Sequence, residues 1–411
     1  MNQLETFATE AVQLTGSKSG PISPIIAHSA AFGYEDSITA EEIFSGTVAK
    51  PVYARMGNPT SSQLETILAK MDGGVGCVTT SSGMAAISMV ALSLCESGDE
   101  IISVGGLFGG TYALFNESLN RFGVKTHFFD VDEIEQIQSA ITPKTKMIFL
   151  ESVGNPNLRL PDFKEIERVA TANGILLAVD NTVTPLSLQP LKFGADIVLY
   201  STTKTIAGHA AALGGAAVFR EIEKNDAKLM STRYKDLHKF VEKAGANALI
   251  AISKKRAMRD FGMSSNAFAG FLTMIGIQTL SLRTERIKKT IETLSHALYD
   301  AGVNVRHPSL KNHEHHARYI KEYENGCGPL LTIDFGNKDR AFSFLEQSKL
   351  ITVTANIGDT RTLGLHMAST IYSDFDDETR KFLGITDGLV RISIGLENET
   401  DLINDFLEAA K

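Results

Sequence analysis

The sequence predicts an α/β protein: a large domain with a mainly parallel sheet, followed by a smaller C-terminal α+β domain. Between about residues 60 and 220, short apolar runs alternate with segments of helical character, the pattern of a parallel sheet with crossover helices. A long amphipathic helix at 283–301 then leads into further strand-like runs and a closing helix. A chain of 411 residues is also long for a single core.

Seven apolar runs predict the strands of the large domain, because each is short and bounded by polar or turn-forming residues. These runs are 75–79, 101–104, 125–129, 147–150, 175–179, 197–200 and 216–219. Helices are expected between them, including 84–95 and 162–172. In the C-terminal domain we expect strands at 330–335 and 389–394 and a helix at 401–410.

The N-terminal region differs from the rest of the chain. It has no regular strand–helix alternation and contains the proline-broken stretch PISPIIAHSAAFGY. We therefore expect an extended arm that packs on another surface. The predicted division is an arm at 1–58, a large domain at 59–280 and a C-terminal domain at 281–411.

Composition narrows the possible partners and location. The formal net charge of −8 argues against nucleic acid or an anionic membrane as a partner. The N-terminus lacks the features of a signal peptide, and no apolar run approaches the ~20 residues of a membrane span. Cys77, Cys95 and Cys327 are odd in number and far apart, so they indicate no disulfide framework. A reduced, cytoplasmic protein is expected.

Two predicted strands deliver complementary groups to the same edge of the sheet. One ends at Asp180, and another is followed by Ser201 and Lys204. Ligands of open α/β sheets bind beyond the carboxyl ends of such strands. This set suits pyridoxal phosphate: a lysine holds the aldehyde as a Schiff base, and a carboxylate keeps the ring nitrogen protonated. Taken singly, a solvent-facing lysine and an N-capping aspartate would explain these residues equally well.

A third element supports the cofactor interpretation. Small residues at 80–86 follow a predicted strand and open a helix, and backbone N–H groups at a helix start favour an anion. An ordinary serine N-cap is the alternative for this segment alone.

In addition, seven motifs resemble the Cys/Met-metabolism family of pyridoxal-phosphate enzymes, which has the aspartate-aminotransferase fold (fold type I). They occur in order over nearly the whole chain: YARMGNPT (53–60), SSGMAA (81–86), GGTY (109–112), GNPN (154–157), VDNT (179–182), STTK…GH (201–209) and VRISIGLE (390–397).

The resemblance implies a role for each matched residue. Lys204 would carry the cofactor and transfer protons, and Asp180 would pair with the pyridinium nitrogen. Arg391 and Asn356 would hold the substrate carboxylate, although a structural ion pair is the alternative for Arg391. Tyr53 and Arg55 would reach the phosphate of a neighbouring subunit, which implies a dimer and usually a homotetramer, a dimer of dimers. The remaining cofactor contacts implied are Gly83, Met84, Asn155, Thr182, Ser201 and Thr203.

Some positions depart from the family pattern. Phe108 replaces the tyrosine that relatives stack on the cofactor ring, so stacking remains but the phenol is lost. After Ser369 and Thr370, the family's Thr-His pair is Ile371-Tyr372, which affects the substrate pocket. The SVGNPN form around Gly154 is similar to O-acetylhomoserine sulfhydrylases.

Three functions are compared. The first is γ-replacement on O-acetylhomoserine with sulfide or a thiol, giving homocysteine or methionine plus acetate. The second is γ-elimination from methionine, or cystathionine synthesis or cleavage. The third is a non-catalytic scaffold, which is disfavoured because Lys204, Asp180 and Arg391 are all present. The missing phenol at Phe108 favours the first function.

No metal site is predicted. His313, His315 and His316 do not have the spacing of a helical metal pair. We expect them on a solvated helix surface.

Overall fold

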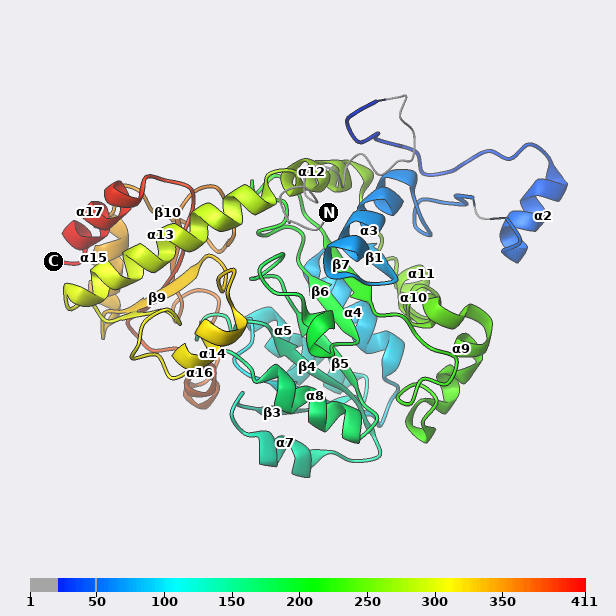
Figure 1. The fold of residues 1–411 in the computed structure, drawn as a ribbon, viewed down its shortest axis with the longest axis horizontal. Helices are drawn as coiled ribbons and strands as arrows, with labels where there is room; N and C mark the ends of the chain where they lie inside the picture. The colour runs from blue at the N-terminus through cyan, green and yellow to red at the C-terminus, as the bar shows by residue number, and fades with distance from the viewer. Residues whose placement is uncertain (1–20, 49) are drawn as a thin grey trace.

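The computed structural model describes residues 21–48 and 50–411. Two sheets form the centres of two lobes (Figure 1). The longest helix, α13 (Leu280–Asp300), runs from the junction of the lobes along the smaller one. The division of the chain at residues 58 and 280 stays a prediction.

The large lobe contains a seven-stranded sheet in the order β1-β7-β6-β5-β4-β2-β3. Five neighbouring strands, from β6 to β3, run parallel, while β7 is antiparallel to both β1 and β6. The strands are β1 (Gly76–Thr80), β2 (Glu100–Val104), β3 (Lys125–Phe129), β4 (Thr145–Glu151), β5 (Leu176–Asp180), β6 (Ile197–Tyr200) and β7 (Gly215–Phe219). The predicted mainly parallel sheet is confirmed; the bounds of β3 and β6 match the prediction, and the other strand ends differ by at most two residues.

Helices cover both faces of this sheet, because successive residues of its central strands point to opposite faces and are apolar and buried. On β4, Ile148 and Leu150 belong to one core and Met147 and Phe149 to the other. The helices are α3 (Pro59–Asp72), α4 (Gly83–Leu94), α5 (Gly109–Ala113), α6 (Leu119–Arg121), α7 (Ile134–Ala140), α8 (Phe163–Ala172), α9 (His238–Ala244), α10 (Ala248–Ser253), α11 (Arg259–Phe261) and α12 (Ala267–Ile277). Short 3-10 turns span Pro190–Phe193, Thr232–Leu237 and Gly245–Asn247, and π-helical turns span Leu114–Ser118 and Lys254–Met258.

The small lobe has a five-stranded sheet in the order β10-β11-β12-β9-β8, in which only β10 and β11 pair in parallel. Its central strands pack against α13 and α17 in a separate core. The strands are β8 (Val305–Arg306), β9 (Leu330–Asp334), β10 (Thr352–Val353), β11 (Leu363–His366) and β12 (Leu389–Ser393). The helices are α14 (His316–Glu322), α15 (Lys338–Gln347), α16 (Asp377–Leu383) and α17 (Glu399–Ala409).

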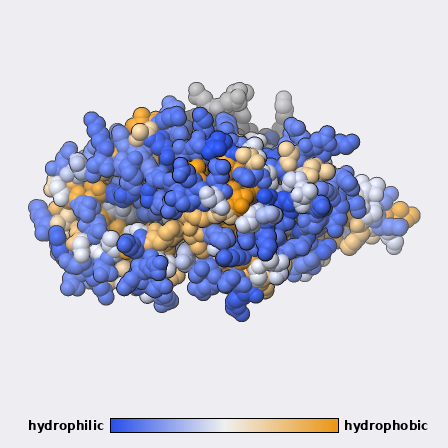
Figure 2. Space-filling view, turned by 90° about the horizontal axis from the view of Figure 1, so that it is seen from below, coloured by the Kyte–Doolittle hydropathy of each residue, from blue (hydrophilic) through white to orange (hydrophobic). Residues whose placement is uncertain are grey.

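The described part of the N-terminal arm projects from the large lobe (Figure 1). Thr60 anchors its base, because its hydroxyl donates to Ile25 O at 2.8 Å and accepts from Ala27 N at 2.8 Å. The arm contains a helix, α2 (Ser37–Ser45), that was not predicted. Apolar residues are visible at the projecting end of the molecule (Figure 2), where Ile38 and Phe44 of α2 are exposed. The part of the predicted arm at 1–20 lies outside the described residues.

Among residues 21–48 and 50–411, none of the helices combines the length and the apolar character needed to span a bilayer.

A buried hydrogen bond ties the large sheet to α3 at the strand end that precedes Ser201. Tyr200 donates its hydroxyl to Asp72 Oδ1 at 2.7 Å and accepts from Asn181 Nδ2 at 3.1 Å. Burial raises the pKa of Asp72 to about 7, although the Tyr200 hydrogen bond partly opposes this rise. The folded protein therefore keeps a proton on Asp72 at pH values where the unfolded chain has lost it.

Asp72→Asn should remove a pH dependence of stability. Between about pH 4 and about pH 7 the folded wild type binds more protons at this site than the unfolded chain, so its stability falls as pH rises. A pKa rise from 3.8 to about 7 corresponds to about 4 kcal/mol at most. Denaturant unfolding across this range should show the variant gaining stability relative to wild type. If the free energies of unfolding of the two proteins change with pH in parallel, the raised pKa assigned to Asp72 is wrong.

Candidate functional site

A cavity of about 220 Å³ lies at the carboxyl ends of the parallel strands and is closed by residues of the small lobe. It collects most of the side chains predicted from the sequence. Those lining it are Gly83, Met84, Phe108, Asn155, Asp180, Thr182, Ser201, Thr203, Lys204 and Arg391.

Asp180 is the last residue of β5, and Thr182 orients it. The Thr182 N–H donates to Asp180 Oδ1 at 3.0 Å, while its hydroxyl oxygen accepts from Ser201 N at 2.7 Å. The turn after β5 is therefore bonded to the turn after β6. Burial raises the pKa of Asp180, and no cation forms an ion pair with it among the described residues.

The N-terminus of α4 points its first N–H groups at the same cavity. Ser82 caps the helix by accepting from Ala85 N at 3.1 Å, so Gly83 and Met84 present N–H groups that have no intrahelical partner. The turn packs tightly on Ser201, since a Cβ at Gly83 would lie 2.6 Å from Ser201 Cβ. Only glycine allows this close approach.

The two hydroxyls beside Lys204 have different surroundings. Thr203 donates its hydroxyl hydrogen to Gly214 O at 3.1 Å and accepts from Gly214 N at 3.0 Å. A ligand would have to compete with Gly214 for that hydrogen. Ser201 also lines the cavity and is the more available hydroxyl donor.

Lys204 reaches across the cavity to the small lobe. Its Nζ donates to Asn356 Oδ1 at 2.7 Å, which brings in a predicted residue that does not itself line the cavity. Burial, followed by the nearby Arg391 guanidinium, lowers the pKa of Lys204 to about 8. About a tenth of this amine is therefore unprotonated at pH 7, far more than for an ordinary lysine.

Arg391 stands in the middle of β12 and is 2% exposed. Its Nη1 donates to Asn155 Oδ1 at 3.0 Å, and burial lowers its pKa to about 10. No carboxylate lies within ion-pair distance of this guanidinium in the described part of the chain. A direct structural ion pair is therefore not supported, and an anion entering the cavity would meet a cation that no carboxylate of the described chain contacts.

Phe108 lines the cavity from the loop after β2. Two tyrosines lie near this loop but do not line the cavity. Tyr372 is fully buried, and its hydroxyl donates toward Leu107 O and Asn155 O at 3.3 and 3.2 Å. The Tyr112 ring packs against Phe128 and Phe375. Among the described residues of this chain, no tyrosine lines the cavity in place of the phenol missing at Phe108.

The structure does not bring Tyr53 and Arg55 to the cavity of their own chain. Tyr53 is 45% exposed, and Arg55 donates from Nη1 to Arg259 O at 2.5 Å. Both lie at the base of the arm.

Glu151 lines the cavity but was missed at the sequence level. It ends β4 beside Asp180 and is its register partner. Burial and the neighbouring Asp180 raise the pKa of Glu151 well above its usual value. The signal was present in the sequence, because an acidic residue follows the apolar run 147–150 just as Asp180 follows 175–179.

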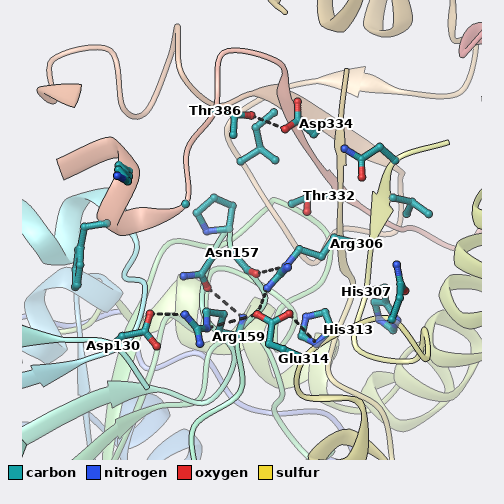
Figure 3. Close-up of a pocket in the computed structure, with 18 of the residues that line it drawn as sticks. Asp130, Asn157, Arg159, Arg306, His307, His313, Glu314, Thr332, Asp334 and Thr386 are labelled. Carbon is teal, nitrogen blue, oxygen red and sulfur yellow. Dashed lines mark hydrogen bonds and ion pairs between the residues drawn. The ribbon is translucent and has the colours of Figure 1, made fainter. Parts of the chain in front are cut away.

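A larger cavity of about 780 Å³ lies elsewhere between the lobes (Figure 3). Four of its charged residues already pair with one another. Arg159 bonds Asp130 at 2.6 Å and lies 3.5 Å from Glu314, while Arg306 bonds Glu314 and donates to Asn157 O at 2.8 Å. The smaller cavity is therefore the better candidate for catalysis.

The prediction that the histidines lie on a solvated helix surface is wrong for two of them. His313 and His315 are 6% and 5% exposed because the segment before α14 packs against the large lobe. The Leu160 N–H donates to His315 Nδ1 at 2.9 Å. Burial lowers the pKa of His313 to about 4, so its ring is neutral at neutral pH. No group suited to a metal ion occurs among the residues described.

Residues 5–411 match the model of the Cys/Met metabolism PLP-dependent enzyme family. The chain belongs to this family. It is therefore a pyridoxal-phosphate-dependent enzyme, and the predicted family and cofactor are confirmed.

Among characterised relatives, the homocysteine synthase of Schizosaccharomyces pombe is 35% identical over 372 residues, 87% of this chain and 86% of that one. The O-acetyl-L-homoserine sulfhydrylase 1 of Thermus thermophilus is 35% identical over 371 residues, 87% of this chain and 88% of that one. A Campylobacter jejuni crystal structure, described as an O-acetylhomoserine (thiol)-lyase with a pyridoxyl-lysine monophosphate, is 30% identical. It has a TM-score of 0.92 and covers 100% of both chains, which confirms the predicted fold type I.

The residues present fit pyridoxal phosphate. The cavity holds a partly buried carboxylate, Asp180, that has no cationic partner in the described chain, and a pyridinium nitrogen would supply one. The helix start at Gly83 and the hydroxyl of Ser201 suit a phosphate. Lys204 is an amine of lowered pKa at the same site.

The rate at which the apoprotein combines with pyridoxal phosphate should rise with pH about a midpoint near 8, since only the neutral Lys204 amine attacks the aldehyde. Arg391→Met should move this midpoint upward, because removing a nearby positive charge favours protonated Lys204. Stopped-flow absorbance would follow the reaction in both proteins. The ionisation of free pyridoxal phosphate is the same in both experiments, so a difference between the two midpoints must come from the protein. Identical midpoints would refute the influence of Arg391.

Proposed function

We propose that this chain is an O-acetylhomoserine sulfhydrylase, which replaces the acetate of O-acetylhomoserine by sulfide or a small thiol and forms homocysteine or methionine. The observation that carries the proposal is Phe108 in the cavity, with no tyrosine hydroxyl in its place. The names of the relatives agree with this activity.

When bound, pyridoxal phosphate supplies an electron sink for the substrate amino acid. Lys204 anchors the cofactor and moves protons, for which a pKa of about 8 is suited. Asp180 holds the proton of the ring nitrogen. Gly83, Met84 and Ser201 hold the phosphate, with Thr203 as a further hydroxyl released from Gly214.

Arg391 and Asn356 bind the substrate carboxylate in this proposal. The guanidinium of Arg391 is buried without a carboxylate partner in the described chain, and a carboxylate suits its fork of donors. The bond from Arg391 to Asn155 Oδ1 leaves the Asn155 amide nitrogen as the donor for the cavity. That nitrogen would suit the 3′-oxygen of the cofactor, and Thr182 would lie beside its ring.

The leaving group explains why Phe108 matters. Acetate is the conjugate base of an acid with a pKa near that of a side-chain carboxyl, about 4, whereas a thiol has a pKa of about 8.5. A poor leaving group needs a proton from a general acid, and a good one does not. A cavity without a phenol should therefore release acetate readily and a thiolate poorly.

Wild-type enzyme with sulfide should use O-acetylhomoserine with a kcat/KM at least about 100-fold above that for methionine or cystathionine. Phe108→Tyr should narrow this ratio by raising the rate with thioethers, because it restores an acid beside the ring. Assays of homocysteine and 2-oxobutyrate would measure the replacement and the elimination reactions of each protein. A wild-type preference for methionine would indicate a γ-lyase instead.

We also propose that the arm completes the site of a second copy within a homotetramer built as a dimer of dimers. Tyr53 and Arg55 are exposed at the base of the arm and do not line the cavity of their own chain. The exposed apolar residues of α2 support contact with another copy. In that copy Arg55 would bind the cofactor phosphate in trans.

Mixing Arg55→Ala with Lys204→Ala subunits should restore activity, because each hybrid dimer contains one intact site. With random pairing, about a quarter of wild-type activity is expected. Each variant alone should be nearly inactive. Native mass spectrometry would verify that hybrids form. Verified hybrids without activity would place Arg55 in the site of its own chain.

We further propose a cytoplasmic location. Cys77, Cys95 and Cys327 are free and buried, and unpaired cysteines are typical of a reducing compartment.

A further inference from the structure

The loop that carries Phe108 is held by bonds from two sides. Glu151, at the end of β4, accepts from Phe108 N at 2.7 Å. Tyr372, from the small lobe, donates toward Leu107 O at 3.3 Å. Leu107 O and Phe108 N belong to the same peptide unit, so both polar atoms of one rigid plane are engaged.

Holding this plane limits the directions open to the Phe108 side chain, because it fixes the orientation of the N–Cα bond of Phe108. A planar peptide with its oxygen and nitrogen both bonded cannot rotate without breaking one of the bonds. Leu107 and Tyr372 are fully buried, and Glu151 is 7% exposed. Water therefore does not readily replace either bond.

The same two residues also hold Asn155. Its N–H donates to the other oxygen of Glu151 at 3.1 Å, and its carbonyl lies 3.2 Å from the Tyr372 hydroxyl. The single hydroxyl hydrogen of Tyr372 is thus shared between two carbonyl oxygens. Asn155 in turn accepts from Arg391.

The backbone around Tyr372 is itself fixed. Arg380 donates from Nε to Tyr372 O at 3.0 Å. The loop approaches closely, since a Cβ at Gly109 would lie 3.2 Å from the Tyr372 ring and 3.1 Å from Ile371. The Ile371-Tyr372 pair, which departs from the family pattern, is therefore built into the contact with the Phe108 loop.

We propose that Glu151 and Tyr372 are positioning residues that together set Phe108 and Asn155 against the cofactor ring. Glu151 acts from the large lobe and Tyr372 from the small lobe, which also supplies Arg391. The placement of the Phe108 side chain therefore depends on the small lobe, which binds the substrate through Arg391 in the proposed function. This inference rests on the proposed positions of Phe108 and Asn155 beside the ring.

The test is Tyr372→Phe, which removes one oxygen atom and keeps the ring. Tyr112→Phe is the matched control, because Tyr112 packs in the same aromatic cluster without lining the cavity. The visible circular dichroism of the bound cofactor should change in Tyr372→Phe and stay as wild type in Tyr112→Phe. The kcat for O-acetylhomoserine should fall by about tenfold, as expected for one lost buried hydrogen bond, with a smaller change in KM.

Glu151→Gln adds a second measurement. An amide keeps one acceptor oxygen but turns an N–H donor toward one of the two backbone N–H groups. Its effect on kcat and that of Tyr372→Phe should be non-additive, because both act on the same peptide plane. If Glu151→Gln fails to fold, Tyr372→Phe and its control decide the question alone.

The proposal would be overturned if Tyr372→Phe had the same circular dichroism and the same kcat as the wild-type enzyme. So would a lowered melting temperature with unchanged dichroism, which indicates a role in stability only. Dichroism is recorded without substrate, so it tests the positioning even if the wild-type enzyme does not use O-acetylhomoserine. Failure of the proposed function would appear separately, in the substrate preference of the wild type.

Discussion

Two carboxylates, Glu151 and Asp180, end neighbouring parallel strands in register; Glu151 is buried and Asp180 is partly buried at the cavity. Burial and their mutual proximity raise the pKa of Glu151, and burial raises that of Asp180. The hydrogen bonds at this edge of the sheet are arranged around these two neighbouring carboxyl groups. Glu151 accepts hydrogen bonds from the backbone N–H groups of Phe108 and Asn155 and so holds these two loops in place. Asp180 accepts one backbone N–H bond and also lines the cavity. Lys204 and Arg391 supply the cationic side of the same space.

Much of the fold was predictable because its strands are short, apolar and buried. The strand ends at Asp180 and Ser201 were correctly placed at one edge, and ten of the residues chosen from motif and position line one cavity. Burial on both faces leaves little ambiguity in such runs. The reversed direction of β7 could not be predicted, because an apolar run carries no sign of strand direction.

Other features depend on contacts between distant segments. His313 and His315 follow a polar pattern, yet packing against the loop at 157–160 buries them. Glu151 was overlooked because a single acid after a strand also fits an ordinary cap. The hydrogen bond from Tyr372 to Leu107 joins residues 265 positions apart, so no local sequence pattern predicts it. Tertiary packing decides each of these cases.

The cavity brings together Asp180, which has no cationic partner in the described chain, and Arg391, which has no carboxylate within ion-pair distance there. Charging either group in the cavity carries a desolvation cost that a ligand of opposite charge would offset. Binding to the folded state alone adds stability in proportion to the logarithm of ligand concentration. A chain without bound cofactor is then less stable than the loaded chain, and less stable chains are degraded faster in cells.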